Sequence, residues 1–388
     1  MPVKNRFAEL QSEIAAWRQD IHAHPELLFD THRTSALVAE KLREFGCDEV
    51  VEGIGRTGVV GVIKGKSDSK GRVIGLRADM DALPIYEATG LDYASTEPGK
   101  MHACGHDGHT AMLLGAAKYL AETRNFDGTA IVIFQPAEEG GGGGREMVED
   151  GMMDRFGVQE VYGMHNMPGI PVGHFAIRPG AMMAAADQFE ITVTGKGGHA
   201  AKPHSCIDTT VIGSHIVIAL QTIASRNVDP LKQAVVSVCT FRTESEAFNV
   251  IPQTVTLRGT VRTMDPAVRD QVEARIKAIA TATAEAFAGT AEVDYQRGYP
   301  VTMNAPENTD FAVAAAEKVS GQVDTEIAPL MGAEDFSYML ESRPGAYIFL
   351  GNGDTAMVHH PEYNFDDNAI PFGSSWYAEM VETRMPAA

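Results

Sequence analysis

The sequence has few cysteines, a shortage of positive charge and no long apolar run. Its four cysteines, Cys47, Cys104, Cys206 and Cys239, lie far apart in a chain of 388 residues. Free thiols or one metal thiolate are therefore expected rather than a disulfide framework. The chain has 32 basic and 52 acidic residues, a net charge of −20. This negative charge opposes binding to phosphate backbones or anionic lipid. We expect neither nucleic acid nor a membrane as partner.

The beginning of the chain also lacks an apolar targeting segment. Arg18, Asp20 and Glu26 interrupt the first 28 residues, so these residues lack the apolar centre of a secretory signal peptide. No later stretch approaches membrane-spanning length. These absences predict a soluble cytoplasmic protein. A chain of this length with 44% hydrophobic residues can bury a large core and favours two domains.

Apolar spacing predicts an α/β domain built on a mostly parallel sheet. Helices are predicted at residues 8–21, 34–45 and 110–123, and strands at 59–63, 73–76, 130–134, 161–164 and 346–350. The helix at 110–123 connects two of these strands in a βαβ unit, whose crossover makes the strands parallel. Five glycines at 140–144 are expected to let the backbone pass close to a site or another chain.

Residues 187–296 follow a different order of elements. The predicted sequence is strand 189–195, helix 206–225, strands 234–241 and 254–263, helix 266–287 and strand 291–296. This βαββαβ order is the split, ferredoxin-like pattern. We expect a lid domain at 187–296, inserted into a catalytic-like domain formed by 1–186 and 297–388.

Metal-binding residue types follow the ends of the predicted strands. In chain order they are Asp79, Asp81, Glu138, Glu139, His165 and, after a short loop, His359. Ligands of open α/β sheets gather at the carboxyl ends of strands, so these residues are expected to converge. Cys104 and His106 lie on a loop just before a helix, whose N-terminus favours the thiolate form.

Most of these residues also have an ordinary structural explanation. Cys104 could be a buried structural thiol, and His102, His106 and His109 could form a solvated loop. Asp79 and Asp81 could cap a turn. His165 and His359, each taken alone, are more often ordinary polar histidines.

The adjacent acids Glu138 and Glu139 are harder to explain in that way. They follow an apolar strand and the rigid pair Gln135-Pro136, which fixes their direction. One carboxylate held on a cation stays ionised, while an uncoordinated neighbour can shuttle protons. On the predicted lid, His199 follows a strand and two glycines and could reach a substrate oxyanion.

Motifs spread over nearly the whole chain, from HAHPEL at 22–27 onward, resemble those of a known family. The motifs, in order, are RADMDALP, HACGHDGH, FQPAEEG, GMHNMP, GKGGHAAKPH, NVIP, MGAEDFSY and VHHPEYNFDDNAIP. They resemble the hippurate hydrolase, N-acyl-L-amino acid amidohydrolase and auxin-conjugate amidohydrolase group. This group is a branch of the dinuclear metallo-aminoacylase and carboxypeptidase superfamily, peptidase clan MH.

The resemblance implies an αβα-sandwich catalytic domain with a ferredoxin-like lid that mediates dimerisation. It implies hydrolysis of N-acyl amino acids, such as N-benzoyl or N-acetyl compounds, to a carboxylic acid and a free amino acid by metal-activated water. Two divalent transition-metal ions per chain are expected. Because the ligands include a thiolate, zinc, manganese, cobalt and nickel all fit.

Position by position, the resemblance makes Cys104 a bridging ligand of two metal centres. The other ligands it implies are His106, Glu139, His165 and His359. His359 is preferred to His360 because the family's H-x-P triplet matches His359-His360-Pro361. Asp79 stands where the wider superfamily has a metal-binding histidine.

The remaining site residues also follow from the resemblance. Glu138 would be the general base and acid, and Asp81 would orient the ligands. His199 would polarise the scissile carbonyl, commonly across the dimer, while Asn249 and Arg262 would hold the substrate carboxylate.

Two other interpretations stay open. A dipeptidase, a carboxypeptidase or an N-acetyl-diaminopimelate deacetylase would use the same machinery on other amides. A metal-dependent binding protein without hydrolytic activity could use the same scaffold. Glu138 argues against the binding protein, because binding needs ligands but not a spare base.

Overall fold

The computed structural model describes residues 4–387, which divide into two compact units. Unit 1 contains the residues up to Met182, Met303–Ala328 and the residues from Asp335, and unit 2 contains Met183–Thr302 and Pro329–Glu334. These units differ by several residues from the expected boundaries at 187 and 296, and unit 2 also includes the segment Pro329–Glu334. Ala184 donates its N–H to the carbonyls of Leu330 and Gly332, a long-range pairing that no local sequence pattern indicates.

Unit 1 is built on an eight-stranded mixed sheet in the order β1-β2-β4-β3-β5-β16-β6-β15. Its strands are β1 (Glu49–Ile54), β2 (Gly58–Lys64), β3 (Val73–Asp79), β4 (Thr129–Gln135), β5 (Glu160–Met167), β6 (Phe175–Ala176), β15 (Val323–Asp324) and β16 (Gly345–Gly351). The central strands β4, β3, β5 and β16 are parallel neighbours. They are almost entirely buried, as parallel strands covered on both faces must be.

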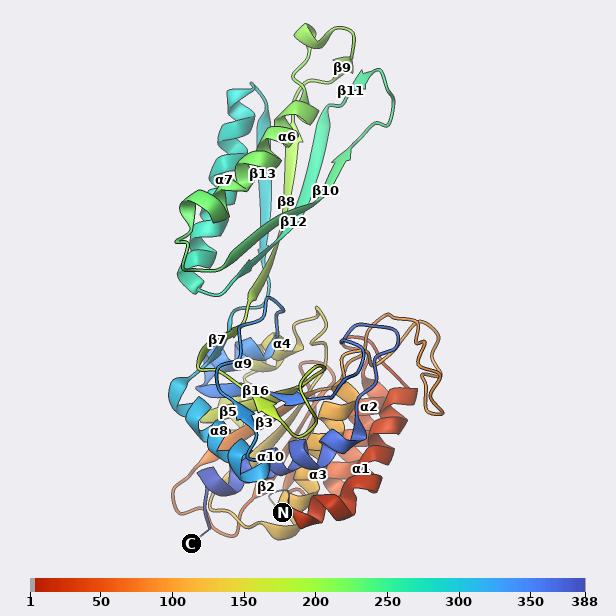
Figure 1. Ribbon diagram of the computed structural model, residues 1–388, viewed down its shortest axis with the longest axis vertical. Helices are drawn as coiled ribbons and strands as arrows, with labels where there is room; N and C mark the ends of the chain where they lie inside the picture. Colours follow the sequence, from red (N-terminus) through yellow and green to blue (C-terminus); the bar gives the residue numbers. More distant parts are fainter. Residues whose placement is uncertain (1–3, 388) are drawn as a thin grey trace. The chain divides into compact units, whose positions relative to one another are not determined.

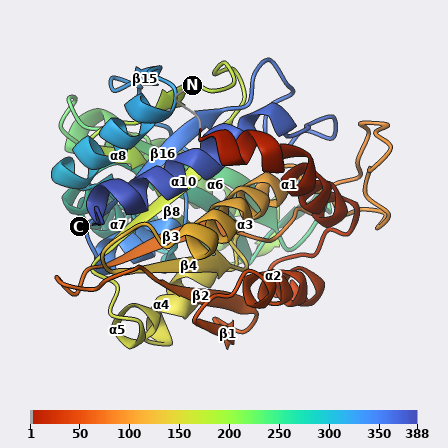
Figure 2. The ribbon, with the colours of Figure 1, turned by 90° about the horizontal axis from the view of Figure 1, so that it is seen from below.

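Helices cover both faces of this sheet, which confirms the expected αβα sandwich. Figure 2 shows α1, α3 and α10 side by side, and α3 packs on the sheet. The helices α4 and α9 pack on each other and against β4 and β5 respectively. The helices of unit 1 are α1 (Asn5–Ala23), α2 (His32–Glu44), α3 (His106–Thr123), α4 (Gly143–Glu149), α5 (Met152–Arg155), α8 (Pro306–Val319), α9 (Phe336–Ser342), the 3₁₀ turn η3 (Asp367–Ala369) and α10 (Ile370–Arg384).

The helix predicted at 110–123 begins earlier, at His106. Gly105 precedes it with a φ of 88°, and a Cβ on this residue would approach the side chains of Asn166 and Tyr363 to within 2.4 Å. Only glycine combines this backbone with this close approach. His106 is therefore placed on the first helical turn, and His165 lies within β5 rather than beyond it.

Unit 2 is a four-stranded antiparallel sheet in the order β10-β12-β8-β13 with α6 and α7 packed on it (Figure 1). This is the strand order of the ferredoxin-like pattern, which confirms the predicted lid fold. The elements are β8 (Ala185–Thr194), β9 (Gly198–His199), η1 (Pro203–Ser205), α6 (Thr209–Leu220), η2 (Ile223–Asn227), β10 (Ala234–Thr243), β11 (Val250–Ile251), β12 (Thr254–Thr263), α7 (Pro266–Ala286) and β13 (Thr290–Arg297). The short strands β7 (Gly180–Met183) and β14 (Thr302–Asn304) lie where the chain passes between the units.

None of the helices within residues 4–387 combines the length and the apolar character that crossing a bilayer requires. All four cysteines carry free thiols. Cys104 is buried, whereas Cys239 is exposed.

Candidate metal centre

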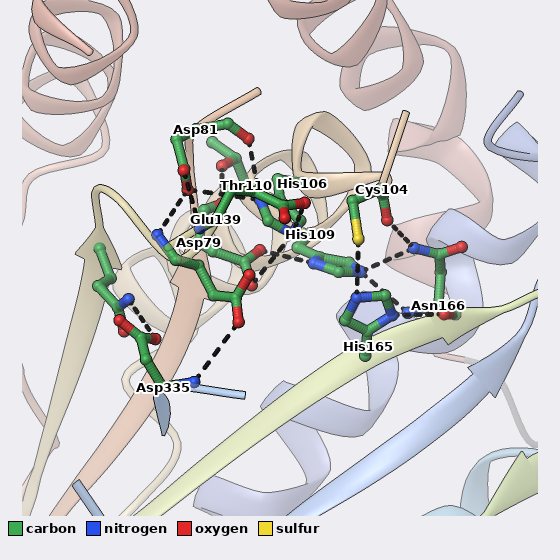
Figure 3. Close-up of polar contacts among 12 residues, drawn as sticks. Asp79, Asp81, Cys104, His106, His109, Thr110, Glu139, His165, Asn166 and Asp335 are labelled. Carbon is green, nitrogen blue, oxygen red and sulfur yellow. Dashed lines mark hydrogen bonds and ion pairs between the residues drawn. The ribbon is translucent and has the colours of Figure 1, made fainter. Parts of the chain in front are cut away.

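Three residues from two parts of unit 1 form a first set of possible metal ligands. Cys104 precedes α3, His106 begins it, and His165 comes from β5. Their ligand atoms lie within 4.8 Å of one another, and Cys104 Sγ is 3.3 Å from His165 Nε2 (Figure 3). One thiol and two imidazoles make a donor set that suits divalent transition metals.

A second set shares the same thiol. Cys104, Glu139 and His359 also bring their ligand atoms within 4.8 Å of one another, and His359 Nε2 lies 3.3 Å from Glu139 Oε1. The backbone of His359 has a φ of 66°, and its N–H donates to the carbonyl of Ala103. His360, by contrast, accepts an N–H from Glu362 on its own ring nitrogen. The two sets that share Cys104 have the composition of a two-metal site with one bridging ligand.

The polar atoms of this centre fit a cation. Among the described residues, His106 Nε2 is buried without a hydrogen-bond partner, which is costly unless something binds there. Glu139 Oε1 is also buried, and the His359 ring is its ion-pair partner. Burial opposes charge on His106, but the carboxylates of Asp79, Asp81 and Glu139 raise its pKa to about 10. This local excess of negative charge is what a bound cation would neutralise.

Burial shifts the pKa values of the other two ligands of the first set, Cys104 and His165, in opposite directions. Burial, followed by the nearby carboxylates, raises the pKa of the Cys104 thiol well above its ordinary value. Burial lowers the pKa of His165 well below its ordinary value, so this imidazole is neutral and able to bind a metal. Cation binding must therefore displace a proton from Cys104.

Asp81 holds the ligands in place from both sides. Its carboxylate oxygens accept the N–H groups of Glu138 at 2.9 Å and Glu139 at 3.1 Å. Its carbonyl lies 2.9 Å from His106 Nδ1. Because a carbonyl only accepts, Nδ1 must carry the proton when His106 is neutral, which leaves Nε2 available to a cation. These contacts fix the direction of the His106 ring and of the backbone at Glu138 and Glu139; the orienting role of Asp81 stays a prediction.

Asp79, His106 and His109 are also close enough to form a ligand set, but hydrogen bonds argue against it. His109 Nδ1 lies 2.6 Å from Asp79 Oδ1, and His109 Nε2 accepts the N–H of Asn166 at 2.9 Å. Arg77 takes the other oxygen of Asp79. Both ring nitrogens of His109 are therefore engaged, whereas His106 Nε2 makes no hydrogen bond within residues 4–387.

Glu138 lies beside the ligands. Its carboxylate groups with His106 and Glu139 within 4.8 Å, it is 7% exposed, and Oε1 accepts the N–H of Asp335 at 3.4 Å. The sequence predicts a role for Glu138 but not its contact with Asp335.

The three lid residues lie in unit 2. His199 on β9 pairs with Val250 on β11, and the N–H of Ala200 donates to the carbonyl of Asn249, so His199 and Asn249 are neighbours. Arg262 lies near the far end of β12, where it donates to the carbonyl of Val261. The structure brings His199 and Asn249 together but leaves Arg262 at the other end of the sheet.

Sequence reasoning missed several buried polar residues that support this centre. Asn166 donates from Nδ2 to the carbonyl of Cys104 at 2.6 Å and accepts from the hydroxyl of Tyr363. Arg77, Gln135 and Asp335 form a further buried network. Each lies inside or beside a motif already singled out, so position within the motifs was the signal that could have found them.

Comparison with known proteins identifies the family of this chain. Residues 75–383 match peptidase family M20/M25/M40. The chain belongs to this family. It is 45% identical to a hippurate hydrolase of Campylobacter jejuni subsp. jejuni, across 96% of this chain and 97% of that protein.

Two further proteins are also similar to this chain. An N-acetyl-L-cysteine deacetylase of Bacillus subtilis is 42% identical across 94% of this chain and 86% of its own length. A crystal structure from Bacillus subtilis, described as a dinuclear metal binding peptidase from the M20 family, superposes with a TM-score of 0.86 at 34% identity, covering 98% of this chain and 100% of that one. The resemblance stated from the motifs is confirmed, and the chain is a metallo-amidohydrolase that uses divalent metal.

Proposed function

We propose that this M20-family enzyme hydrolyses the amide bond of N-acyl amino acids, releasing a carboxylic acid and a free amino acid. The observation that carries the proposal is the buried carboxylate of Glu138 beside two ligand sets that share Cys104. A relative named hippurate hydrolase and another named N-acetyl-L-cysteine deacetylase support this substrate class.

Two divalent ions per chain are part of the proposal. Cys104, His106 and His165 would hold one, and Cys104, Glu139 and His359 the other. When bound, such ions supply Lewis acidity, which lowers the pKa of a water molecule and polarises a carbonyl. Zinc, manganese, cobalt and nickel remain equally compatible with the donors.

The chain's own groups divide the remaining work. Glu138, which is not needed as a ligand in either set, would accept a proton from the attacking water and return it to the leaving amine. His199 would donate to the oxyanion, and Asn249 and Arg262 would hold the substrate carboxylate.

A substrate panel tests this function. We expect the metal-loaded protein to cleave N-benzoyl and N-acetyl amino acids, and to cleave the matching carboxamides at least ~10-fold more slowly because Arg262 loses its anionic partner. Chelation should remove activity and added metal should restore it. Release of the amino acid is measured directly by a ninhydrin-type amine assay.

The same panel decides between the alternatives. Faster cleavage of dipeptides or of N-acetyl-diaminopimelate would assign the enzyme to the peptidase or deacetylase group, whose machinery is shared. Binding of these ligands by the metal-loaded protein without any cleavage would favour a binding protein.

We further propose that two copies associate through unit 2. The strand β10 forms one edge of the four-stranded sheet, and an edge strand ten residues long offers backbone groups for pairing with another chain. Beside it, α6 exposes Val211 and Ile218, the latter by 68%. Apolar side chains next to an open edge favour burial against a second copy.

A cytoplasmic location also stays a prediction from composition.

The layout of unit 2 supports a site shared between two copies. His199 and Asn249 lie next to the Thr254 end of β12, whereas Arg262 lies eight residues along that strand. At about 3.3 Å per residue, the two ends are roughly 26 Å apart. One N-acyl amino acid is too small to contact both ends of the same sheet. If all three residues serve one substrate, they must come from different chains.

Mixing two inactive variants tests this sharing. A His199→Ala chain keeps a sound metal centre, and a Glu138→Gln chain keeps a sound His199. After subunit exchange, each heterodimer should contain one complete site, so activity should return to about one site in four for random pairing. Activity of the mixture is measured alongside exchange, which native mass spectrometry verifies.

The matched control mixes Glu138→Gln with Cys104→Ala, whose lesions both lie in unit 1. That mixture should stay inactive. Verified exchange without recovery in the His199→Ala mixture would mean that His199 acts within its own chain or not at all.

A further inference from the structure

A fully buried ion network adjoins the metal centre, and the proposed reaction does not account for it. It joins Arg77, Gln135 and Asp335, which come from three separate motifs and are all 0% exposed. Arginine and aspartate are rarely buried completely unless they are paired. The contacts of these residues show what the network holds in place.

Arg77 on β3 occupies the middle of the network. Its Nε donates to Gln135 Oε1 at 2.8 Å, Nη1 to Asp79 Oδ2 at 2.8 Å, and Nη2 to Asp335 Oδ1 at 3.0 Å. The planar guanidinium fork fixes the relative directions of its partners. The guanidinium of Arg77 therefore links Asp79, which lies close to His106, to Asp335.

Asp335 is held at both carboxylate oxygens. Oδ1 also accepts from Gln135 Nε2 at 2.7 Å, and Oδ2 accepts the N–H of Gly144 at 2.8 Å. A Cβ on Gly144 would come within 2.8 Å of the Asp335 carbonyl, so the last glycine of the run at 140–144 permits this approach. With its side chain fixed, Asp335 presents its own backbone N–H to Glu138 Oε1.

We propose that Arg77 and Asp335 are positioning residues that aim the carboxylate of Glu138 at the reacting water. Asp81 holds the backbone N–H of Glu138, and the Asp335 N–H contacts its carboxylate. At 3.4 Å this contact is long and therefore weak for a hydrogen bond, so the direction of the Glu138 carboxylate depends on how well the Arg77 network holds the donor. This inference rests on Glu138 being the base.

The test is a double-variant cycle between Asp335 and Glu138. Asp335→Asn keeps the size of the side chain but removes the charge that holds Arg77, so kcat should fall about 10-fold with KM within about 3-fold. In a Glu138→Gln background the same change should alter kcat by less than about 2-fold, because the base it positions is already absent. Metal content and metal affinity should stay at the parent values in both backgrounds.

A matched control comes from unit 2. Asp187 is 1% exposed, pairs with Arg269 at 2.5 Å and accepts the N–H of Gly298, so Asp187→Asn removes a similar buried charge. It should lower the melting temperature comparably while leaving kcat within about 2-fold. A milder variant, Gln135→Met, removes one hydrogen bond from each of Arg77 and Asp335 and should lower kcat about 3-fold if Asp335→Asn fails to fold.

The outcomes separate the two proposals. An equal loss of kcat in both backgrounds, or a loss of bound metal from Asp335→Asn or Gln135→Met, overturns the positioning role and leaves the proposed reaction intact. Full activity of Glu138→Gln alone overturns the assignment of the base and, with it, the positioning role.

Discussion

A Glu138→Gln variant is expected to lose at least ~100-fold in turnover while keeping its metal. Glutamine retains the size of the side chain and can still accept the Asp335 N–H, but it cannot accept a proton. A 100-fold loss corresponds to about 2.7 kcal/mol of lost transition-state stabilisation. Initial rates on an N-acyl amino acid, together with elemental analysis of the same sample, measure both quantities.

The control for this variant is Glu149→Gln at the end of α4, where the side chain is 68% exposed. It makes the same chemical change without touching the metal centre, so turnover should stay within about 2-fold. Activity of Glu138→Gln within a few-fold of the parent would show that another group takes the proton.

A Cys104→Ala variant is expected to hold clearly fewer than two metal ions per chain and to lose all measurable activity. Cys104 belongs to both ligand sets, so one substitution removes a donor from each. The measurement is metal stoichiometry by elemental analysis after dialysis, with activity on the same preparation.

Cys47→Ala provides the matched control, because Cys47 is a free and partly buried thiol outside the ligand sets; its metal content should match that of the parent. The same assay compares the two adjacent histidines. His359→Ala should lose metal, since His359 faces Glu139, whereas His360→Ala should be mild. Full occupancy in Cys104→Ala contradicts the bridging role, and the reverse order for the histidines contradicts the choice of His359.

The spacing of apolar residues predicts both units, although the boundaries in the structure differ from the expected ones by several residues. The βαβ unit around α3 and the six elements of unit 2 follow from runs of apolar residues whose spacing reflects local geometry. The start of α3 was placed four residues late because HDGH is polar, and polar residues in a buried helical turn give no apolar signal. Their burial depends on Arg18, His22, Asp79 and other residues distant in sequence.

The candidate ligands could be named from the sequence because their residue types and motif positions carry the information. The motifs alone predict five ligands: Cys104, His106, Glu139, His165 and His359. Their division into two sets that share Cys104 was implied by the resemblance alone, and the geometry of the described residues now supports it. The roles themselves stay predictions until the variants are measured.

The sequence by itself determined the family, the mixed α/β class, the ferredoxin-like lid and the ligand types, because these depend on residue chemistry and local spacing. Only the tertiary structure decided that His109 is engaged by Asp79 and Asn166, and that Asp335 reaches Glu138. It also placed Arg262 at the opposite end of β12 from His199. The physical reason is that hydrogen bonds between residues far apart in the chain depend on direction and distance, which are fixed only when the strands pack.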